Sequence, residues 1–351
     1  MTSERWSVGA RLARRALAAP APLLDRVAGP PSIVDGRVLD RSAQALLAVG
    51  ERVAPDRSNA DVAAMRAQMR QIAPLGLPVR ADVITADRIL AGPGGPLEIR
   101  TYRPAYTADP PPVWVYAHGG GWVTGDLDTH DATCRLLAAE GRCAVVSVHY
   151  RRAPEHPFPA AIDDTLAAYR WIHERADDLD VDGSRVGLMG DSAGGNLAAV
   201  VALLARDLDV PNAAAQCLVY PAVDLTMSSA SHRSMSEGFG LDHAAMVRYR
   251  SMYLPPEVEW TDPRVSPWFA PDLSGLPPAL IVTAGFDPLR DDGVMYADAL
   301  RKVGVPVRYR CYDDQIHGFF GMGVLPGGMV RVREVCRLAG DLLHGGATWA
   351  T

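Results

Sequence analysis

The chain has 351 residues, a hydrophobic fraction of 48% and a formal net charge of −6. This length and apolar content allow a large core in one α/β domain, and the negative charge argues against a nucleic-acid partner. Five scattered cysteines without a C-x-x-C pair argue against zinc or thiol-redox chemistry, so we expect no metal, no cofactor and a reducing, cytoplasmic location.

Residues 1–82 are interpreted as a helical, proline-punctuated cap segment. Trp6, Ala10, Ala13 and Leu17 share one helical face, with arginines on the other, as in an amphipathic helix. Basic residues before a short apolar run are also typical of a signal or membrane-associated segment, and this alternative stays open. Since no apolar run approaches the ~18 residues of a transmembrane helix, we expect no membrane span. Two further helices are predicted at residues 42–53 and 59–72.

From residue 83 the pattern changes to strands that alternate with helices. The strands are continuous apolar runs, which indicates a mostly parallel eight-stranded sheet with helices on both faces. The predicted strands are residues 83–90, 97–102, 113–117, 143–149, 185–189, 213–220, 279–285 and 305–312. The predicted helices are residues 159–176, 195–206 and 329–343, with another that starts near Pro288.

The connection between Tyr220 and Ala279 is unusually long. It holds roughly 55 residues, whereas a plain connection in an α/β domain is much shorter. A helix is predicted at residues 242–253, followed by a proline-rich return. We therefore interpret residues 222–270 as a cap insertion in a catalytic domain of residues 83–351, forming a lid together with the N-terminal helices.

Residues 190–194 read GDSAG, between a predicted buried strand and a predicted helix. A serine on such a strand-to-helix turn is how an α/β hydrolase presents its nucleophile. The glycines are needed because the turn brings strand and helix too close for a Cβ. We therefore predict Ser192 as the nucleophile, although the motif alone is also compatible with an ordinary tight turn.

Asp287 and His317 each follow a predicted strand downstream of Ser192. The order Ser, Asp, His is the one that this fold requires. His317 is therefore the predicted base, later the acid, and Asp287 the residue that orients and stabilises its imidazole. Asp291 and Asp292 are close rivals for the acid. The rival histidines do not follow the last strand; they are His149, His156 and His344.

The chain resembles the hormone-sensitive-lipase-like branch of the α/β hydrolases, which includes bacterial carboxylesterases. The motifs that carry the resemblance are HGGGW at 118–122, YRRAPEHPFPA at 150–160, GDSAGGN at 190–196, DPLRDD at 287–292 and HGF at 317–319. The resemblance runs from about residue 83 to the C-terminus. It departs from the family at Arg152, where leucine is more common. Asp163, just after the second motif, is interpreted as either structural or on a helix surface.

The glycines at 119–121 can offer backbone N–H groups where a side chain would block approach. In similar enzymes the second and third glycines donate to the oxyanion, which here implies Gly120 and Gly121, together with the N–H of Ala193. His118 is expected to brace this loop. The candidate residues for an acyl pocket are Trp122, Phe239, Met246, Tyr249 and Tyr253, although all except Trp122 are also compatible with ordinary cap core.

These observations favour a serine carboxylesterase that hydrolyses short-to-medium acyl esters through an acyl-enzyme. An amidase, an arylformamidase or an acyltransferase could use the same triad. A ligand-binding receptor on a hydrolase scaffold is disfavoured, because all three triad candidates are present. The expected partner is a small-molecule ester, and the resemblance implies a homodimer through about residues 305–343.

Overall fold

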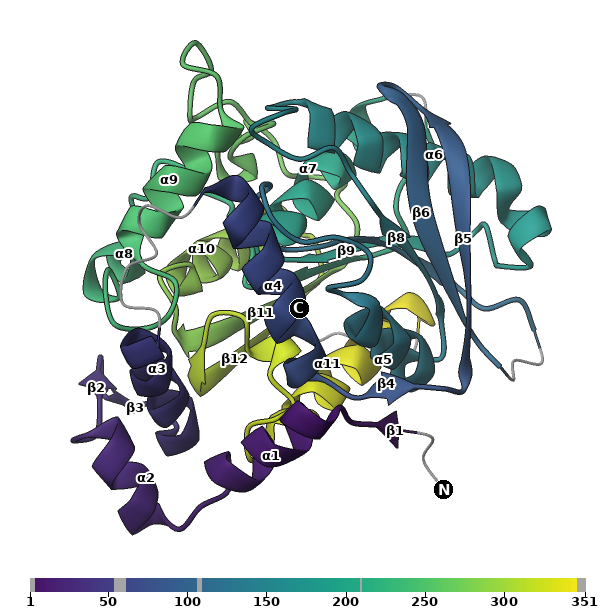
Figure 1. Ribbon diagram of the computed structural model, residues 1–351. Coiled ribbons are helices and arrows are strands. Elements are labelled where there is room, and N and C mark those ends of the chain that lie inside the picture. The colour runs from purple at the N-terminus through teal and green to yellow at the C-terminus, as the bar shows by residue number, and fades with distance from the viewer. Residues whose placement is uncertain (1–3, 54–60, 106–108, 209, 346–351) are drawn as a thin grey trace.

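The computed structural model describes residues 4–53, 61–105, 109–208 and 210–345, and it is built around one eight-stranded sheet (Figure 1). Its strand order is β12-β11-β10-β9-β7-β8-β6-β5. Adjacent strands from β12 to β8 are parallel, whereas β6 pairs antiparallel with both β8 and β5. The predicted sheet is thus confirmed, with strands β5 Val83–Gly92, β6 Gly95–Pro104, β7 Val113–Ala117, β8 Ala144–Val148, β9 Val186–Asp191, β10 Gln216–Val219, β11 Ala279–Phe286 and β12 Val307–Ile316.

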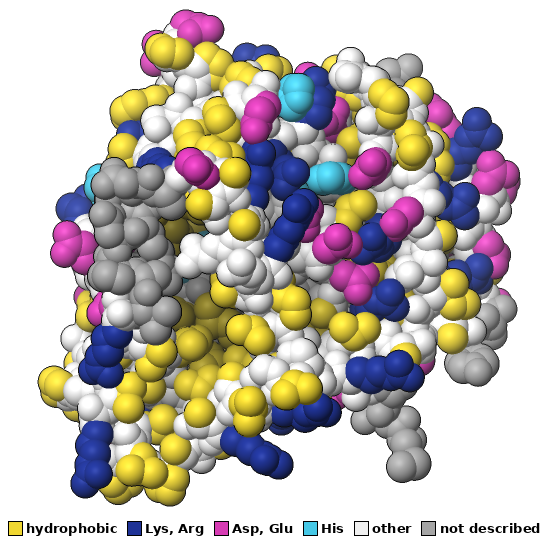
Figure 2. All heavy atoms as spheres, viewed as in Figure 1, with side chains coloured by type: hydrophobic (Ala, Val, Ile, Leu, Met, Phe, Trp, Pro, Cys, Tyr) yellow, Lys and Arg dark blue, Asp and Glu magenta, His cyan; other side chains and the backbone are white. Residues whose placement is uncertain are grey.

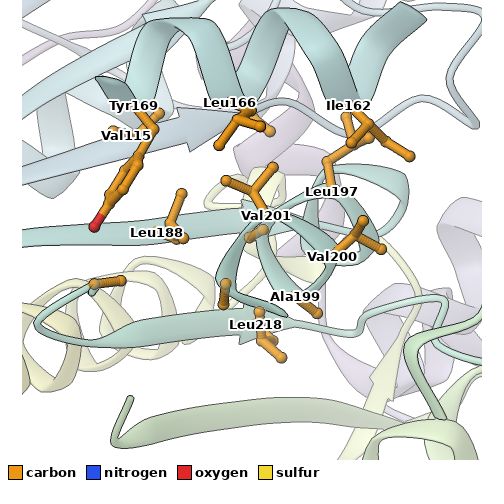
Figure 3. Close-up of a cluster of buried hydrophobic side chains, with 14 of the residues drawn as sticks. Val115, Ile162, Leu166, Tyr169, Leu188, Leu197, Ala199, Val200, Val201 and Leu218 are labelled. Carbon is orange, nitrogen blue, oxygen red and sulfur yellow. The ribbon is translucent and has the colours of Figure 1, made fainter. Parts of the chain in front are cut away.

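Helices cover both faces of this sheet, which explains why its central strands are apolar on both sides. Figure 3 shows Ile162 and Leu166 of one helix over Leu197 and Val201 of the next, with Leu188 of the sheet beneath them. A second buried cluster lies on the opposite face, between the sheet and the last helix. The helices of the first face are α6 Ala160–Leu179, α7 Ala193–Asp207 and α10 Arg290–Lys302; those of the second are α5 Asp131–Gly141 and α11 Gly328–Leu343.

The N-terminal segment is helical, as predicted, but differs in two details. The first helix begins after Ser7, so Trp6 precedes it. Helix α1 ends at Leu17, and a second helix, which was not predicted, begins at Ala21 beside Pro20 and Pro22, because proline fits the first turn, where no N–H is needed. Asn59 and Ala60, the predicted start of the fourth helix, lie outside the described residues. The elements are β1 Glu4–Arg5, α1 Val8–Leu17, α2 Ala21–Ala28, β2 Ile33–Val34, β3 Arg37–Val38, α3 Arg41–Val53, α4 Val62–Gly76 and β4 Val79–Arg80.

The long connection after β10 contains the predicted helix and contacts the N-terminal segment. A Cβ on Gly240 would lie 3.2 Å from the side chain of Leu47 on α3. Phe239 and Leu47 also pack against the same apolar cluster. The two segments proposed to form a lid therefore touch each other (Figure 1). The elements of this connection are α8 Ala230–Ser234, α9 His243–Tyr253 and η1 Pro267–Phe269, and η2 Phe319–Gly321 follows β12.

Two findings complete the comparison with the sequence. Helix α5 was not predicted, although its buried apolar residues pack beneath α11. Within the described residues, no helix is both long and apolar enough to cross a membrane.

Candidate active site

Ser192 lies on a strained turn between β9 and α7. Its φ of 56° and ψ of −121° are rare for a residue with a side chain. The turn is possible because a Cβ on Gly190 would collide with Gly194, and one on Gly194 would collide with Ala117. The backbone N–H of Ser192 donates to the Val219 carbonyl at 2.8 Å, which holds the turn against β10.

The three residues predicted as a catalytic triad come together at this turn. Nε2 of His317 lies 3.0 Å from Oγ of Ser192, and Nδ1 of His317 lies 2.8 Å from Oδ2 of Asp287. Asp287 is completely buried, and its other oxygen accepts a 2.9 Å hydrogen bond from the N–H of Leu289. The ring of Tyr220 packs against the imidazole, with centroids 4.5 Å apart. No motif in the sequence indicated a role for Tyr220.

The rival acids are committed to other partners. Oδ1 of Asp292 lies 3.0 Å from Nε2 of His232, and both side chains are buried. Asp291 accepts from the side chain of Arg290 and the backbone of Ser231.

The rival histidines are likewise elsewhere. Nδ1 of His149 lies 3.1 Å from a carboxylate oxygen of Glu98, Nε2 of His344 lies 3.0 Å from the Arg142 carbonyl, and His156 is exposed. The described structure brings only His317 to Ser192.

The glycine loop after β7 lies beside this turn. Gly119 donates its N–H to Oδ1 of Asp191 at 3.0 Å, which ties the loop to the residue just before Ser192. Gly120 and Gly121 have φ values of 120° and 60°, a region that other residues rarely adopt. Among the described residues, the N–H groups of Gly120, Gly121 and Ala193 donate to no acceptor. These three donors are therefore free for a ligand.

A buried polar cluster lies behind the loop. His118 is stacked between His130 and Tyr150, with ring centroids at 5.4 and 4.2 Å. Burial, reinforced by the neighbouring His130, lowers the pKa of His118 to about 3. The Tyr150 hydroxyl donates to the His118 carbonyl at 2.8 Å. His118 thus braces the loop as a neutral group, which agrees with its predicted role.

Asp191 is the anion of this cluster. It accepts from the hydroxyl of Tyr116 at 2.6 Å, and its Oδ1 lies 3.6 Å from Nε2 of His130. Burial alone would raise the pKa of Asp191, but His130, Tyr116 and the Gly119 N–H together lower it below its ordinary value. The Asp191 carboxylate is thus engaged by Tyr116 and Gly119 and not by the Ser192 hydroxyl.

Arginines of helix α4 hold the same loop from outside. Arg66 donates to the carbonyl of Val123 at 2.9 Å and to that of Ala153 at 3.0 Å. It also forms a two-pronged ion pair with Glu155. Nε of Arg70 donates to Asp126 at 2.6 Å. The sequence contained no signal for the contacts with Val123 and Ala153, because their acceptors are backbone carbonyls.

Of the two interpretations of Asp163, the structure supports a position on the helix surface, and the structural carboxylate after the second motif is Asp164. Asp164 is buried and accepts from the backbone N–H of Arg151 at 2.8 Å and from its guanidinium. Asp163 faces outward on the same helix. A shift of one residue on a helix rotates a side chain by about 100°, which moves it from the core to the surface.

The predicted pocket residues fall into two groups. Trp122 is stacked flat on Tyr253, with centroids 4.5 Å apart, and Tyr253 is completely buried. Tyr249 lies so close to Gly121 that a Cβ there would collide with its ring. Met246 is half-buried beside the same core.

Phe239 belongs to the second group, on the side of the N-terminal helices. Its ring contacts Phe286 at a centroid distance of 5.3 Å. Figure 2 shows a hollow lined by hydrophobic side chains at the position of α3 and β12 in Figure 1. Partly buried apolar residues of this region are Leu46, Leu47, Phe239 and Met322.

The site contains no evident metal-binding group. Within the described residues, no three His, Cys, Asp or Glu side chains are arranged to hold a metal ion.

The sheet is mostly parallel, and a serine lies at the turn after its central strand. An imidazole lies at hydrogen-bond distance from this serine, and free N–H groups lie beside it. This is the arrangement of an α/β hydrolase. A sequence model of the α/β-hydrolase fold matches residues 114–321. The chain belongs to this family, in its hormone-sensitive-lipase-like branch.

Several known proteins resemble most of the chain. It is 43% identical over 311 residues to the carboxylic ester hydrolase LipN of Mycobacterium tuberculosis, covering 86% of this chain and 82% of that protein. It is 39% identical to the esterase LipI of the same organism, covering 87% and 94%. Its structure matches the ester hydrolase EH1AB1 from the metagenome of Lake Arreo, solved with a bipyridine phosphonate derivative, with a TM-score of 0.83, 40% identity and coverage of 88% and 100%.

Proposed function

We propose that this protein is a serine carboxylesterase with Ser192 as nucleophile, His317 as base and Asp287 as the orienting acid. The observation that carries the proposal is the continuous hydrogen-bonded line from the serine Oγ through the imidazole to the buried carboxylate, with distances of 3.0 and 2.8 Å. The relatives named as carboxylic ester hydrolases and esterases support the same activity.

The geometry supports a distinct role for each group in the proposed reaction. Asp287 accepts a hydrogen bond from Nδ1–H of His317, so the unprotonated Nε2 is free to take the proton of Ser192. The serine Oγ then attacks the ester carbonyl, and His317 passes the proton to the leaving alcohol. Water, activated by the same imidazole, hydrolyses the acyl-enzyme. Gly120, Gly121 and Ala193 donate their free N–H groups to the oxyanion in both steps.

The pocket is proposed to accept short-to-medium acyl chains. Tyr249 and Trp122 stand directly beside the glycine loop, with Met246 near them, and Tyr253 supports Trp122 from behind. Phe239 packs against a different apolar cluster, on the side of the N-terminal helices. We expect p-nitrophenyl butyrate to be hydrolysed much faster than the palmitate ester. Equal or faster turnover of palmitate contradicts the acyl-length proposal alone.

Active-site labelling tests the mechanism directly. A fluorophosphonate probe should label the wild-type protein, and peptide mapping should locate the label on Ser192. Ser192→Ala should abolish labelling and lower kcat by about 10⁶-fold. A Ser228→Ala variant, which alters a serine of the cap, is the matched control and should label normally. A label on any other residue refutes the assignment.

The organisation of the chain follows from the same proposal. Residues 1–82 and 222–270 form the cap, and residues 83–351 carry the catalytic groups. All five cysteines are free thiols, four of them buried, which supports a reducing, cytoplasmic location. A homodimer through residues 305–343 stays a prediction; β12 is the outer strand on its side of the sheet, but the hairpin β2–β3 contacts it. Light scattering of the purified protein tests the dimer.

A further inference from the structure

Helix α1 turns a face of mixed character toward solvent. Ala10 and Leu17 are buried against the rest of the protein. On the opposite side, Val8 and Leu12 stand one turn apart and are 65% and 62% exposed. An amphipathic helix normally hides such residues, so this helix has apolar side chains on both faces.

Arginines lie between these exposed apolar residues. Arg11 and Arg15 flank Leu12 on the outer face, and the guanidinium of Arg14 lies 4.3 Å from the ring centroid of Trp6. Among the described residues, no carboxylate pairs with any of the three arginines. Their positive charge is therefore uncompensated.

The acidic residues of this segment are engaged elsewhere. The first thirty residues contain five arginines and only two acids, Glu4 and Asp25, although the whole chain carries a charge of −6. Glu4 pairs with Arg333, and Asp25 accepts from Nε of Arg41 at 2.9 Å. The segment thus concentrates positive charge on a negatively charged protein.

A groove of about 520 Å³ runs beside the helix. Its walls are the three arginines of α1 and the segment 323–330, which contributes Val324, Leu325 and Met329. No acidic residue lines it. Figure 2 shows basic side chains beside hydrophobic ones where Figure 1 places α1. The groove can accept a negative headgroup together with the first carbons of an alkyl chain.

We propose that α1 docks this protein on the surface of an anionic phospholipid bilayer. Guanidinium groups attract and hydrogen-bond lipid phosphates, and aliphatic side chains on the same face enter the boundary between headgroups and acyl chains. A nucleic acid has phosphates to pair with the arginines but no apolar layer to contact Val8 and Leu12. An acidic protein segment would pair with the arginines and leave Val8 and Leu12 exposed. The bilayer is the one occupant that uses both features.

Vesicle co-sedimentation tests the proposal with the full-length protein. The wild type should sediment with vesicles of 70% phosphatidylcholine and 30% phosphatidylserine, but not with pure phosphatidylcholine. About 0.5 M NaCl should release it, because salt screens exposed charges. Arg11→Gln with Arg15→Gln should weaken binding on the order of 30-fold. Leu12→Gln should weaken it about tenfold.

Matched variants on strand β5 and helix α6 provide the controls. Arg88→Gln with Arg170→Gln removes the same charge from exposed positions far from α1, and Ile89→Gln changes an apolar residue that is 70% exposed. These variants should bind vesicles like the wild type. All variants should hydrolyse p-nitrophenyl butyrate normally, which shows that they are folded.

Four results would overturn the proposal. The first is wild-type protein that ignores phosphatidylserine vesicles at low salt, and the second is equal weakening by the control variants. The third is binding to poly-L-glutamate or duplex DNA that Leu12→Gln leaves unchanged, which would assign the face to an acidic polymer. The fourth is a dimer, seen by light scattering, that the Arg11→Gln, Arg15→Gln variant dissociates.

Discussion

The neutral His118 beneath the glycine loop makes the stability of this protein depend on pH. An unfolded histidine takes up a proton near pH 6.5, whereas burial keeps folded His118 unprotonated until about pH 3. Between these values the unfolded chain binds one more proton than the folded protein. The contribution of His118 to stability is therefore complete above pH 6.5 and declines as the pH falls below it.

The size of this loss follows from the two pKa values. Each pH unit between them costs about 1.4 kcal/mol for one proton, so the loss from pH 7 to pH 5 is about 2 kcal/mol. The groups around His118 are His130, Arg152 and His149, which lower its pKa, the Gly119 carbonyl, and the stacked ring of Tyr150. We expect these groups to remain in place in a His118→Asn variant. The difference between variant and wild type in the pH dependence of the unfolding free energy therefore reports on the buried imidazole alone.

Urea denaturation followed by circular dichroism at pH 7 and pH 5 measures the effect. His118→Asn should be less stable than the wild type at pH 7, but it should lose about 2 kcal/mol less between the two pH values. His156→Gln changes an exposed histidine and should keep the wild-type pH dependence. If His118→Asn and the wild type lose the same free energy of unfolding, His118 is not held neutral, and the reasoning fails.

Three substitutions test the rest of the site through kcat for p-nitrophenyl butyrate. Asp287→Asn should lower kcat about 10⁴-fold by changing the imidazole tautomer, whereas an equal loss in Asp291→Asn would contradict this assignment. Gly121→Ala should lower kcat by about 10²-fold or more. The new Cβ would collide with the Tyr249 ring, and the positive φ is unfavourable for alanine, so the N–H of residue 121 would be displaced from the oxyanion. An unchanged kcat argues against Gly121 as an oxyanion donor. Arg66→Met should lower kcat several-fold with little change in KM, since the glycine loop loses its outer hydrogen bonds, and Arg170→Met should change neither.

The sheet and the meeting of Ser192, Asp287 and His317 could be predicted because each leaves a local pattern. Buried parallel strands are continuous apolar runs, and Ser192, Asp287 and His317 each follow such a run. Since the carboxyl ends of parallel strands meet at one edge, the order along the chain was enough to expect the three side chains together. The boundaries were less certain, as β12 shows by continuing to Ile316 instead of ending near residue 312.

The supporting contacts could not be predicted for two different reasons. His130 approaches Asp191 from the start of α5, and nothing near His130 in the sequence distinguishes it from a surface histidine. Asp164 was missed in favour of Asp163 because the helix was recognised without fixing which of two adjacent carboxylates faces inward. Both errors concern the direction of a side chain, which depends on packing rather than on local preference.

The contacts of Arg66 also change how the chain divides into parts. A boundary at residue 82 follows the motifs, all of which lie beyond it. Yet Arg66 donates to the carbonyl of Val123, in the loop that carries Gly120 and Gly121, and to the carbonyl of Ala153, in the loop after β8. A carbonyl acceptor exists at every residue and leaves no mark in the sequence. The N-terminal segment, which contains no motif, can therefore help to position the N–H groups of Gly120 and Gly121. Its contact with the site runs through the glycine loop.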